Sequence, residues 1–344
     1  MSLPIQAADL RRSFGDVLAV DGVDLEVNEG EIFGFLGPNG AGKSTTVRML
    51  TTLLRPTGGW ARVAGYDVVT DADMVRRSIG VALQDAAIDP LMTGNELLRL
   101  QATLHGIGRT EARRRGAELL ERVGLTAAGE RRVGGYSGGM RRRLDLALSL
   151  VHSPAVLFLD EPTTGLDPMS RIALWEEVRS LNAERGTTVL LTTQYLEEAD
   201  QLAGRIAIID RGRIVSEGTP QSLKTQVGAP TLVLRVDAAH RDAARTLLAE
   251  TFGAERPAPT PEAIAVGLDG GAGAVADVVR VLDEIGAELE SMELHEPSLD
   301  DVFAEATGRR LEGAEESGED SEEEPEPAGD DGTRRGRRRR GGTP

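Results

Sequence analysis

Hydrophobic and polar positions alternate in two different ways along the first 220 residues of the chain. Short apolar runs, such as residues 31–36 (EIFGFL) and 155–159 (AVLFL), are typical of strands that are buried on both faces. Between such runs lie segments with apolar positions at helical spacing, for example residues 44–54. Strands and helices in alternation predict an α/β domain with a largely parallel sheet over residues 1–220.

A second alternation covers residues 221–310 and predicts a small α+β domain. Its expected elements are strands at residues 231–236, 263–266 and 287–294, and helices at residues 238–250, 274–285 and 298–307. Residues 311–344 differ again, because an acidic stretch precedes the basic run RRGRRRR and no aromatic residue is present. Such a segment cannot bury enough apolar surface to offset chain entropy, so we expect a disordered charged tail.

Composition narrows the choice of partners and compartments. Lys and Arg number 39 against 56 Asp and Glu, a formal net charge of −17, so no nucleic-acid partner is expected. The chain has no cysteine, which excludes disulfides, thiol nucleophiles and zinc–thiolate sites. No stretch approaches the length of about 18 apolar residues that spans a membrane. The first 15 residues also lack the apolar core of a secretory signal, so we expect a cytoplasmic location.

Residues 37–44 (GPNGAGKS) match the pattern G-x-x-x-x-G-K-[ST], between an expected strand and an expected helix. Glycines let backbone N–H groups face a phosphate, and the helix N-terminus adds positive potential. Lys43 would add a point charge, and the Ser44 hydroxyl is a ligand for Mg²⁺. The motif therefore predicts nucleotide and Mg²⁺ binding by Gly37, Asn39, Gly40, Ala41, Gly42, Lys43, Ser44 and Thr45.

An acidic pair, Asp160-Glu161, ends the apolar run at residues 155–159. The carboxyl ends of buried strands are where α/β sheets bind ligands. Asp160 is placed to hold Mg²⁺, directly or through water. Glu161 is placed to polarise the water that attacks a γ-phosphate, which makes it the main catalytic candidate.

The segment Tyr136-Ser137-Gly138-Gly139-Met140 precedes this acidic pair, and in that order it resembles the signature motif of ABC ATPases. The resemblance covers residues 5 to about 220. Within these proteins the chain is similar to the daunorubicin-resistance branch, the ATP-binding subunits of bacterial drug exporters. Four segments carry that similarity: residues 136–143, 158–168, 192–200 and 296–303.

The resemblance implies a P-loop ATPase cassette with a parallel-sheet core, an antiparallel β subdomain and a helical subdomain. It implies ATP hydrolysis coupled to transport, with ATP and Mg²⁺ as cofactors. It also adds nucleotide contacts: Phe14 on adenine, Gln84 on Mg²⁺ or its waters, Asp167, and Ser137, Gly138 and Gly139 acting on the nucleotide of a second subunit.

One departure from the family pattern affects the chemistry. Gln194 occupies the position where most ABC ATPases have a histidine. Its amide can hydrogen-bond a γ-phosphate, but it cannot titrate near neutral pH. We expect a catalytic contribution from Gln194 that lacks a histidine ionisation step. Tyr136 and Met140 also replace the usual leucine and glutamine of the signature.

One phosphate loop and one signature per chain predict a head-to-tail homodimer that sandwiches two ATP molecules. By family analogy the chain docks a separate integral membrane permease through residues 85–106 and lies on the cytoplasmic face of the membrane. Leu97, Leu98, Leu100 and Leu104 in that segment are expected mostly to pack the helical subdomain. The alternatives left open are a soluble ABC switch acting on a ribosome or DNA, an exporter of lipid or polysaccharide, and a nucleotide-binding module without catalysis.

Overall fold

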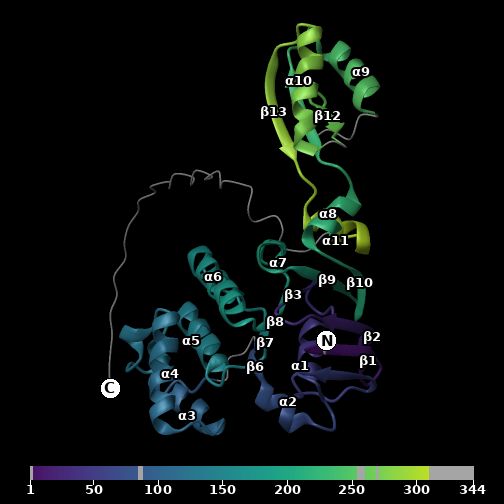
Figure 1. Cartoon of the computed structure of the whole chain (residues 1–344). Helices are drawn as coiled ribbons and strands as arrows, with labels where there is room; N and C mark the ends of the chain where they lie inside the picture. The colour runs from purple at the N-terminus through teal and green to yellow at the C-terminus, as the bar shows by residue number, and fades with distance from the viewer. Residues whose placement is uncertain (1–2, 84–87, 254–259, 269–270, 310–344) are drawn as a thin grey trace, which may run out of the picture. The chain divides into compact units, whose positions relative to one another are not determined.

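The computed structural model describes residues 3–83, 88–253, 260–268 and 271–309 of the chain (Figure 1). These residues belong to one unit, Met1–Ala314, and the second unit, Glu315–Pro344, lies outside them. The tail predicted at residues 311–344 and the predicted site residue Gln84 therefore fall outside the described residues. No helix within the described ranges is both long and apolar enough to cross a membrane.

A six-stranded sheet organises residues 32–218, in the order β10-β9-β3-β8-β7-β6. Neighbouring strands are parallel except β10, which runs antiparallel to β9. The strands are β3 (Ile32–Leu36), β6 (Ile79–Ala82), β7 (Val156–Asp160), β8 (Thr188–Thr193), β9 (Arg205–Asp210) and β10 (Arg213–Gly218). Parallel neighbours need crossover connections, and the helices between these strands supply them, which confirms the predicted α/β class.

A second, antiparallel sheet has the order β2-β1-β4-β5. Its strands are β1 (Ile5–Phe14), β2 (Val17–Val27), β4 (Gly58–Val63) and β5 (Tyr66–Asp67). The helices of this part of the chain are α1 (Lys43–Leu50), α2 (Ala72–Ser78), α3 (Gly94–Leu104), α4 (Arg109–Arg122), α5 (Gly138–Leu150), α6 (Pro168–Arg185) and α7 (Leu196–Leu202). The helices α3, α4 and α5 contact one another and form the helical subdomain, with α5 touching β6 (Figure 1).

Strand β7 shows why the central strands lack a polar alternation. Leu157 and Leu159 pack in a cluster with α3–α6, whereas Val156 and Phe158 point to the opposite face, toward α1 and the antiparallel sheet. All five residues of β7 are buried. The sheet is therefore covered on both faces, as its continuous apolar runs predict.

The described residues between Thr231 and His295 include a separate three-stranded antiparallel sheet with its own cluster of buried side chains. Its elements are β11 (Thr231–Val236), α9 (Arg241–Phe252), β12 (Ile264–Gly267), α10 (Val275–Glu284) and β13 (Leu289–His295). The predicted helix at residues 238–250 begins later, at Arg241, because Asp237 turns the chain first. Its carboxylate accepts hydrogen bonds from the amides of Ala239 and His240.

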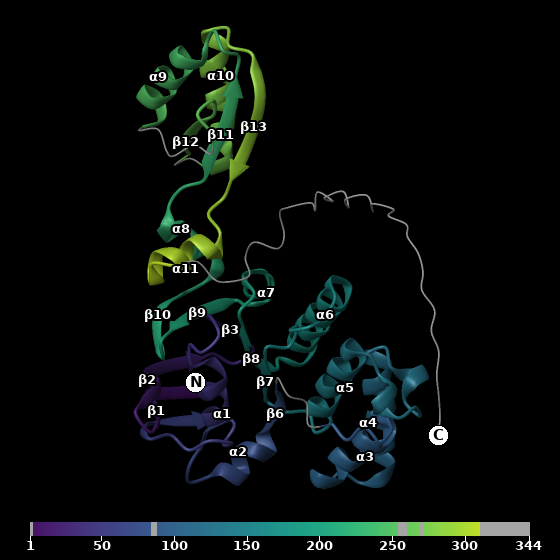
Figure 2. The same ribbon diagram turned by 180° about the vertical axis from the view of Figure 1, so that it is seen from behind.

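Two helices that flank this sheet in the sequence contact each other, α8 (Pro220–Val227) and α11 (Leu299–Thr307) (Figure 2). Leu299, Val302 and Phe303 of α11 belong to a cluster with residues of β9, not to the cluster of the small sheet. A capping box formed by Ser298 and Asp301 fixes the start of α11. The chain thus returns from the small sheet to pack against the central-sheet part.

Phe303 is the largest side chain that α11 contributes to this cluster, and it is fully buried. Phe303→Ala should lower the free energy of unfolding by about 3–5 kcal/mol, because it removes buried apolar area and leaves a cavity. Urea denaturation of the full chain measures the loss. Met292→Ala, at an exposed position of β13, is the control and should change stability by less than about 0.5 kcal/mol. Equal losses for the two variants would show that α11 is not anchored in this cluster.

Candidate functional site

Three loops meet at the carboxyl edge of the parallel sheet, after β3, β7 and β8. Strand β8 lies between the other two, and it pairs Leu36 with Thr193 and Asp160 with Thr192. The three strands therefore end at the same level. The loop at residues 37–42, the acidic pair and Gln194 all begin there.

The loop after β3 needs glycine at two positions because a Cβ atom there would clash with neighbouring backbone. A Cβ at Gly37 would lie 2.3 Å from the carbonyl oxygen of Ile209, and one at Gly42 would lie 2.6 Å from that of Ala19. Gly42 also has a φ of 105°, in the left-handed region that favours glycine. The tight curl leads directly into α1, so Gly40–Ser44 amides lie at a helix N-terminus. Asn39 and Gly40 are exposed at the tip, while Ala41 is buried and Thr45 is half-buried.

Lys43 is buried, and its ammonium group is held by oxygen atoms. Nζ donates to the carbonyl oxygens of Gly37 at 2.7 Å and Pro38 at 3.1 Å. It also lies 3.4 Å from Oε1 of Glu161. Burial lowers the pKa of Lys43, and the nearby Glu161 carboxylate opposes that shift. The predicted phosphate-binding lysine and the predicted water-activating carboxylate are thus in contact.

A chain of hydrogen bonds joins α1 to the acidic pair. Ser44 Oγ donates to Oδ1 of Asp160 at 3.0 Å, and Thr192 Oγ1 donates to the same oxygen at 2.6 Å. The amide of Glu161 donates to Thr192 Oγ1 at 3.1 Å. Asp160 and Glu161 are both buried. The structure therefore brings together Lys43, Ser44, Asp160 and Glu161, as the sequence predicts.

Phe14 and Gln194 belong to elements that adjoin the phosphate loop. Phe14 ends β1, is 47% exposed, and has the guanidinium of Arg12 4.5 Å from its ring centroid. The strand that follows it, β2, reaches the phosphate loop at Ala19. Gln194 is half-buried directly after β8, next to Thr193, whose carbonyl accepts a hydrogen bond from the amide of Gly37 at 3.3 Å.

The signature residues stand apart from the phosphate loop of the same chain. Ser137 and Gly138 are exposed, and Ser137 Oγ caps α5 by accepting from the amide of Met140 at 3.2 Å. Asp167 caps α6 in the same way, and its bonds from the amide and hydroxyl of Ser170 lower its pKa. Gly139 adjoins this second cap, since a Cβ there would lie 3.2 Å from Ser170 Oγ. Among the described residues, no hydrogen bond links Ser137–Gly139 to the phosphate loop.

Four other polar residues support the site, and the sequence analysis assigned them no role. They are Thr192, Arg142, Asp145 and Glu198. Thr192 bridges the acidic pair as described. Arg142 on α5 donates to backbone carbonyls beside Glu161 and is paired with Asp145 at 3.5 Å. Glu198 on α7 is fully buried, accepts from Trp175 Nε1 at 3.1 Å, and has a raised pKa because of burial. A polar residue inside an apolar run was an available signal for Thr192 and Asp145, whereas Arg142 and Glu198 lie in charged runs that do not single them out.

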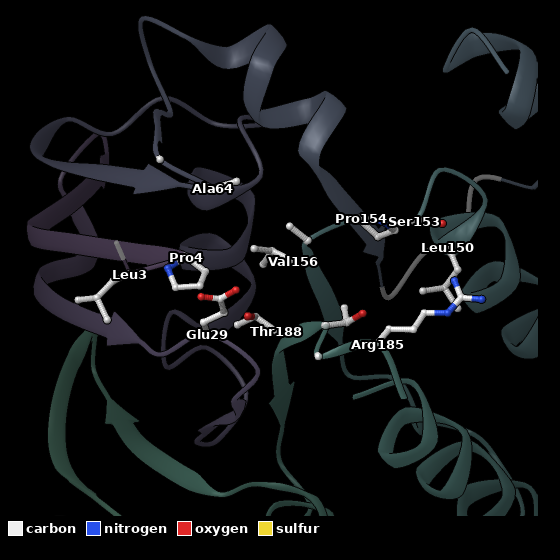
Figure 3. Close-up of a pocket in the computed structure, with 14 residues that line it drawn as sticks. Leu3, Pro4, Glu29, Ala64, Leu150, Ser153, Pro154, Val156, Arg185 and Thr188 are labelled. Atoms are coloured by element: carbon white, nitrogen blue, oxygen red, sulfur yellow. The ribbon is translucent and has the colours of Figure 1, made fainter. Parts of the chain in front are cut away.

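A cavity of about 460 Å³ lies at the other end of the sheet (Figure 3). Its lining includes Val156 and Thr188, the first residues of β7 and β8, with Pro154, Glu29 and Arg185 around them. None of the predicted site residues that the structure describes lines it. This cavity is therefore separate from the candidate site at the carboxyl edge.

The arrangement at that edge defines a class of protein. A glycine-rich loop between a parallel strand and a helix, with a hydroxyl and a lysine facing a buried acidic pair, is the site of a P-loop nucleoside triphosphatase. A family model described as "ABC transporter" matches residues 20–164, which include both halves of this site.

Relatives identify the family. A daunorubicin resistance ATP-binding protein of Streptomyces coeruleorubidus is 48% identical over 90% of this chain and 97% of its own length. A daunorubicin/doxorubicin resistance ATP-binding protein of Streptomyces peucetius is 49% identical over 88% and 92%. A linearmycin resistance ATP-binding protein of Bacillus subtilis is 36% identical over 89% and 99%. The chain belongs to the ABC transporter ATP-binding proteins, in the daunorubicin/doxorubicin-resistance family.

Solved structures agree with this assignment. The ATP-binding subunit of an ABC transporter matches with a TM-score of 0.60 at 28% identity, over 65% of this chain and 93% of that one. An ATP-binding cassette in a dimeric post-hydrolysis state bound to ADP and Pi matches with a TM-score of 0.58 at 26% identity, over 62% and 98%. The protein is an ABC ATPase that binds nucleotide, and the predicted class and enzyme activity are confirmed.

The buried Asp145 provides a pH test of the packing behind the site. Burial raises the pKa of this carboxyl from 3.8 to about 6, against the pull of Arg142. The folded chain therefore binds this proton more tightly than the unfolded chain, and the contribution of Asp145 to stability falls as pH rises through 6. Asp145→Asn does not titrate. Its stability relative to wild type should rise by about 1.4 kcal/mol between pH 5 and pH 8.

Chemical denaturation at both pH values measures this difference. Asp283→Asn, at an exposed position on α10, is the matched control and should track wild type at both values. A constant difference between Asp145→Asn and wild type would contradict the raised pKa.

Proposed function

We propose that the protein is the ATP-hydrolysing subunit of an exporter that expels a drug or antibiotic through a separate membrane protein. The observation that carries the catalytic part is the contact between the phosphate loop and the acidic pair. Lys43 Nζ lies 3.4 Å from Glu161 Oε1, and Ser44 Oγ lies 3.0 Å from Asp160 Oδ1. Phosphoryl transfer needs positioning and charge neutralisation, and these residues offer both.

In this proposal Lys43 and the backbone amides of Gly40–Ser44 hold the β- and γ-phosphates. Asn39 and Gly40 lie at the exposed tip of the loop, and the half-buried Thr45 follows on α1. Phe14 stacks on adenine, because it is a half-exposed aromatic on the hairpin that adjoins the loop. Binding would draw Lys43 toward the phosphates and release Glu161 from its present partner.

Mg²⁺ fits the donors present near the phosphate loop. The Ser44 hydroxyl and the Asp160 carboxylate are hard oxygen ligands on one oxygen-rich side of the site. Ser44 and Asp160 would hold the ion. Gln84, the third predicted ligand, lies outside the described residues. When bound, the ion would neutralise charge on the phosphates. Glu161 would accept a proton from the attacking water, and the Gln194 amide would hydrogen-bond the γ-phosphate.

A homodimer would complete the site. The signature residues Ser137, Gly138 and Gly139 begin a capped helix and are largely exposed, so they are available to a second chain. Asp167 at the adjacent cap would lie at the same interface. The similarity to a cassette in a dimeric state supports this arrangement. In a head-to-tail pair each signature would face the nucleotide of the other chain.

The membrane partner is proposed to dock on the helical subdomain. A cavity of about 790 Å³ there is lined by Leu91, Met92 and Leu100 among others. Leu91 is 71% and Leu100 is 46% exposed, whereas Leu97 and Leu98 are buried in the helical core. The groove also carries Glu96, Arg99 and Arg109, and its exposed apolar side chains suit a segment of an integral membrane permease. The protein would then act on the cytoplasmic face, where ATP is available.

The cargo is proposed from the named resistance functions of the relatives. Three of them are named for resistance to daunorubicin, doxorubicin or linearmycin. Export of a lipid or polysaccharide is the alternative within the same class. A soluble switch on a ribosome or DNA is less well supported, because the chain has a single cassette and a net charge of −17.

Glu161→Gln tests the catalytic proposal. The amide keeps the shape of the carboxylate but cannot accept the proton, so ATP turnover should fall at least about 100-fold. ATP binding should persist, and sedimentation with saturating ATP should show a dimer. Lys43→Ala should fail to bind ATP and should stay monomeric under the same conditions. Full turnover by Glu161→Gln, or a strict monomer with bound ATP, would contradict the corresponding part of the proposal.

Affinity capture from detergent-solubilised membranes of the native host tests the membrane partner. We expect one polytopic membrane protein to co-purify with the wild-type chain. The double variant Leu91→Asp/Leu100→Asp should lose it while keeping ATP turnover, because both side chains line the groove and lie outside the phosphate site. Leu53→Asp/Val69→Asp, at two exposed positions elsewhere, should retain the partner. Recovery of ribosomal or DNA-repair proteins alone would favour the soluble switch.

A further inference from the structure

Arg142 is an almost buried arginine that donates hydrogen bonds to four backbone carbonyls. Its side chain is only 10% exposed, on the second turn of α5. Nη1 donates to the carbonyl of Leu83 at 2.5 Å, and Nη2 donates to that of Asp160 at 2.7 Å. Nη2 also reaches the carbonyl of Glu161 at 3.0 Å, and Nε that of Pro162 at 2.8 Å. Three consecutive carbonyls thus converge on one guanidinium group.

These carbonyls belong to segments that carry the site. Leu83 follows β6 and directly precedes Gln84 in the sequence. Asp160, Glu161 and Pro162 form the end of β7 and the turn after it. The same helix begins at the Ser137 cap, one turn before Arg142. A single side chain therefore ties the signature helix to the acidic pair and to the end of β6.

The turn at Glu161 needs such a tie. Glu161 has a φ of 49°, in the left-handed region that costs a non-glycine residue about 1–2 kcal/mol. A residue remains in that conformation only when its surroundings hold it there. The three carbonyl bonds from Arg142 fix the backbone on both sides of Glu161. That backbone in turn directs the Glu161 carboxylate toward Lys43.

Burying the charged guanidinium of Arg142 costs desolvation energy. Burial lowers its pKa, and the carboxylates of Asp145, Asp160, Glu198 and Glu161 act against that shift. A neutral side chain would avoid the cost but would offer fewer donors. A planar guanidinium with five N–H groups can serve several carbonyls at once, whereas a lysine ammonium is a point charge.

We propose that Arg142 is a positioning residue for ATP hydrolysis, which holds the Glu161 turn in its reactive conformation and links it to the signature helix. This inference rests on the proposed role of Glu161. It assigns Arg142 no contact with nucleotide. Substitution of Arg142 should therefore lower the rate of ATP turnover and leave the affinity for ATP unchanged.

Arg142→Lys tests the assignment. The guanidinium donates to four carbonyls from three nitrogen atoms, whereas an ammonium has three N–H groups on one nitrogen, so the turn at Glu161 should lose part of its support. A misplacement of about 1 Å costs on the order of 100-fold in rate. We expect kcat for ATP to fall between about 10-fold and 100-fold, with the Kd for ATP within about threefold of wild type. Steady-state turnover and binding of a fluorescent ATP analogue by the full chain measure the two quantities.

A double variant separates positioning from general damage. Residual turnover of Glu161→Gln and of Arg142→Lys/Glu161→Gln is compared in single-turnover experiments with radiolabelled ATP. If Arg142 acts through Glu161, its substitution should change the residual rate of Glu161→Gln by less than about threefold. A merely structural role would lower both backgrounds by the same factor, and that result would overturn the proposal.

Two further variants complete the design. Arg115→Lys is the control, since Arg115 also donates to a carbonyl and a carboxylate, those of Val151 and Glu111, away from the site. It should keep wild-type turnover. Arg142→Gln buries no charge and still donates two N–H bonds, so it carries the same test if the lysine variant does not fold.

The outcomes distinguish this inference from the proposed function. Full turnover by Glu161→Gln would refute the role of Glu161 itself. Wild-type turnover by Arg142→Lys or Arg142→Gln, beside an inactive Glu161→Gln, would overturn only the positioning role of Arg142.

Discussion

The parallel pairing of β8 with both β3 and β7 is the constraint on which the site depends. It sets Leu36 beside Thr193 and Asp160 beside Thr192, so that three loops leave the sheet at one level. A slip of one residue would turn the Asp160 side chain to the other face. The hydrogen bond from Ser44 to Asp160, between residues 116 positions apart, is a direct consequence of this register.

Charge balance is the second constraint, because the site buries ions that the chain must neutralise. Lys43 is enclosed by carbonyl oxygens and Glu161, while Asp160 accepts from two hydroxyls. Unpaired charges in such a place would cost several kcal/mol each. Nucleotide phosphates bring negative charge and Mg²⁺ brings positive charge. Mg²⁺ would offset part of the phosphate charge, so nucleotide and metal together would add less net negative charge to the site than nucleotide alone.

Much of the site was predictable because it depends on local patterns. Gly37 and Gly42 are recognisable because the loop has no space for a Cβ at either position. The acidic pair is recognisable because it ends an apolar strand where α/β sheets bind ligands. Packing between distant segments was harder to predict. The run of arginines at 141–143 does not reveal that Arg142 is the one that reaches Asp160. The expectation that the leucines of α3 mostly pack the helical subdomain holds for the buried Leu97 and Leu98. It is wrong for Leu100 and Leu104, which are exposed because they lie on the other face of the helix.

Helix α5 joins two parts of the site, the signature residues at its start and the acidic end of β7. Its N-terminus, at Ser137, is exposed and open to a partner, while Arg142 one turn later holds the chain's own acidic strand end. The two ends of this link are one helical turn apart, so the Ser137 cap and the Arg142 bond to the acidic strand end lie on the same rigid element. In the head-to-tail pair proposed above, contact of Ser137 with the partner's nucleotide would therefore act on Glu161 of the same chain. Hydrolysis at each site of that pair would then depend on whether the other site holds nucleotide.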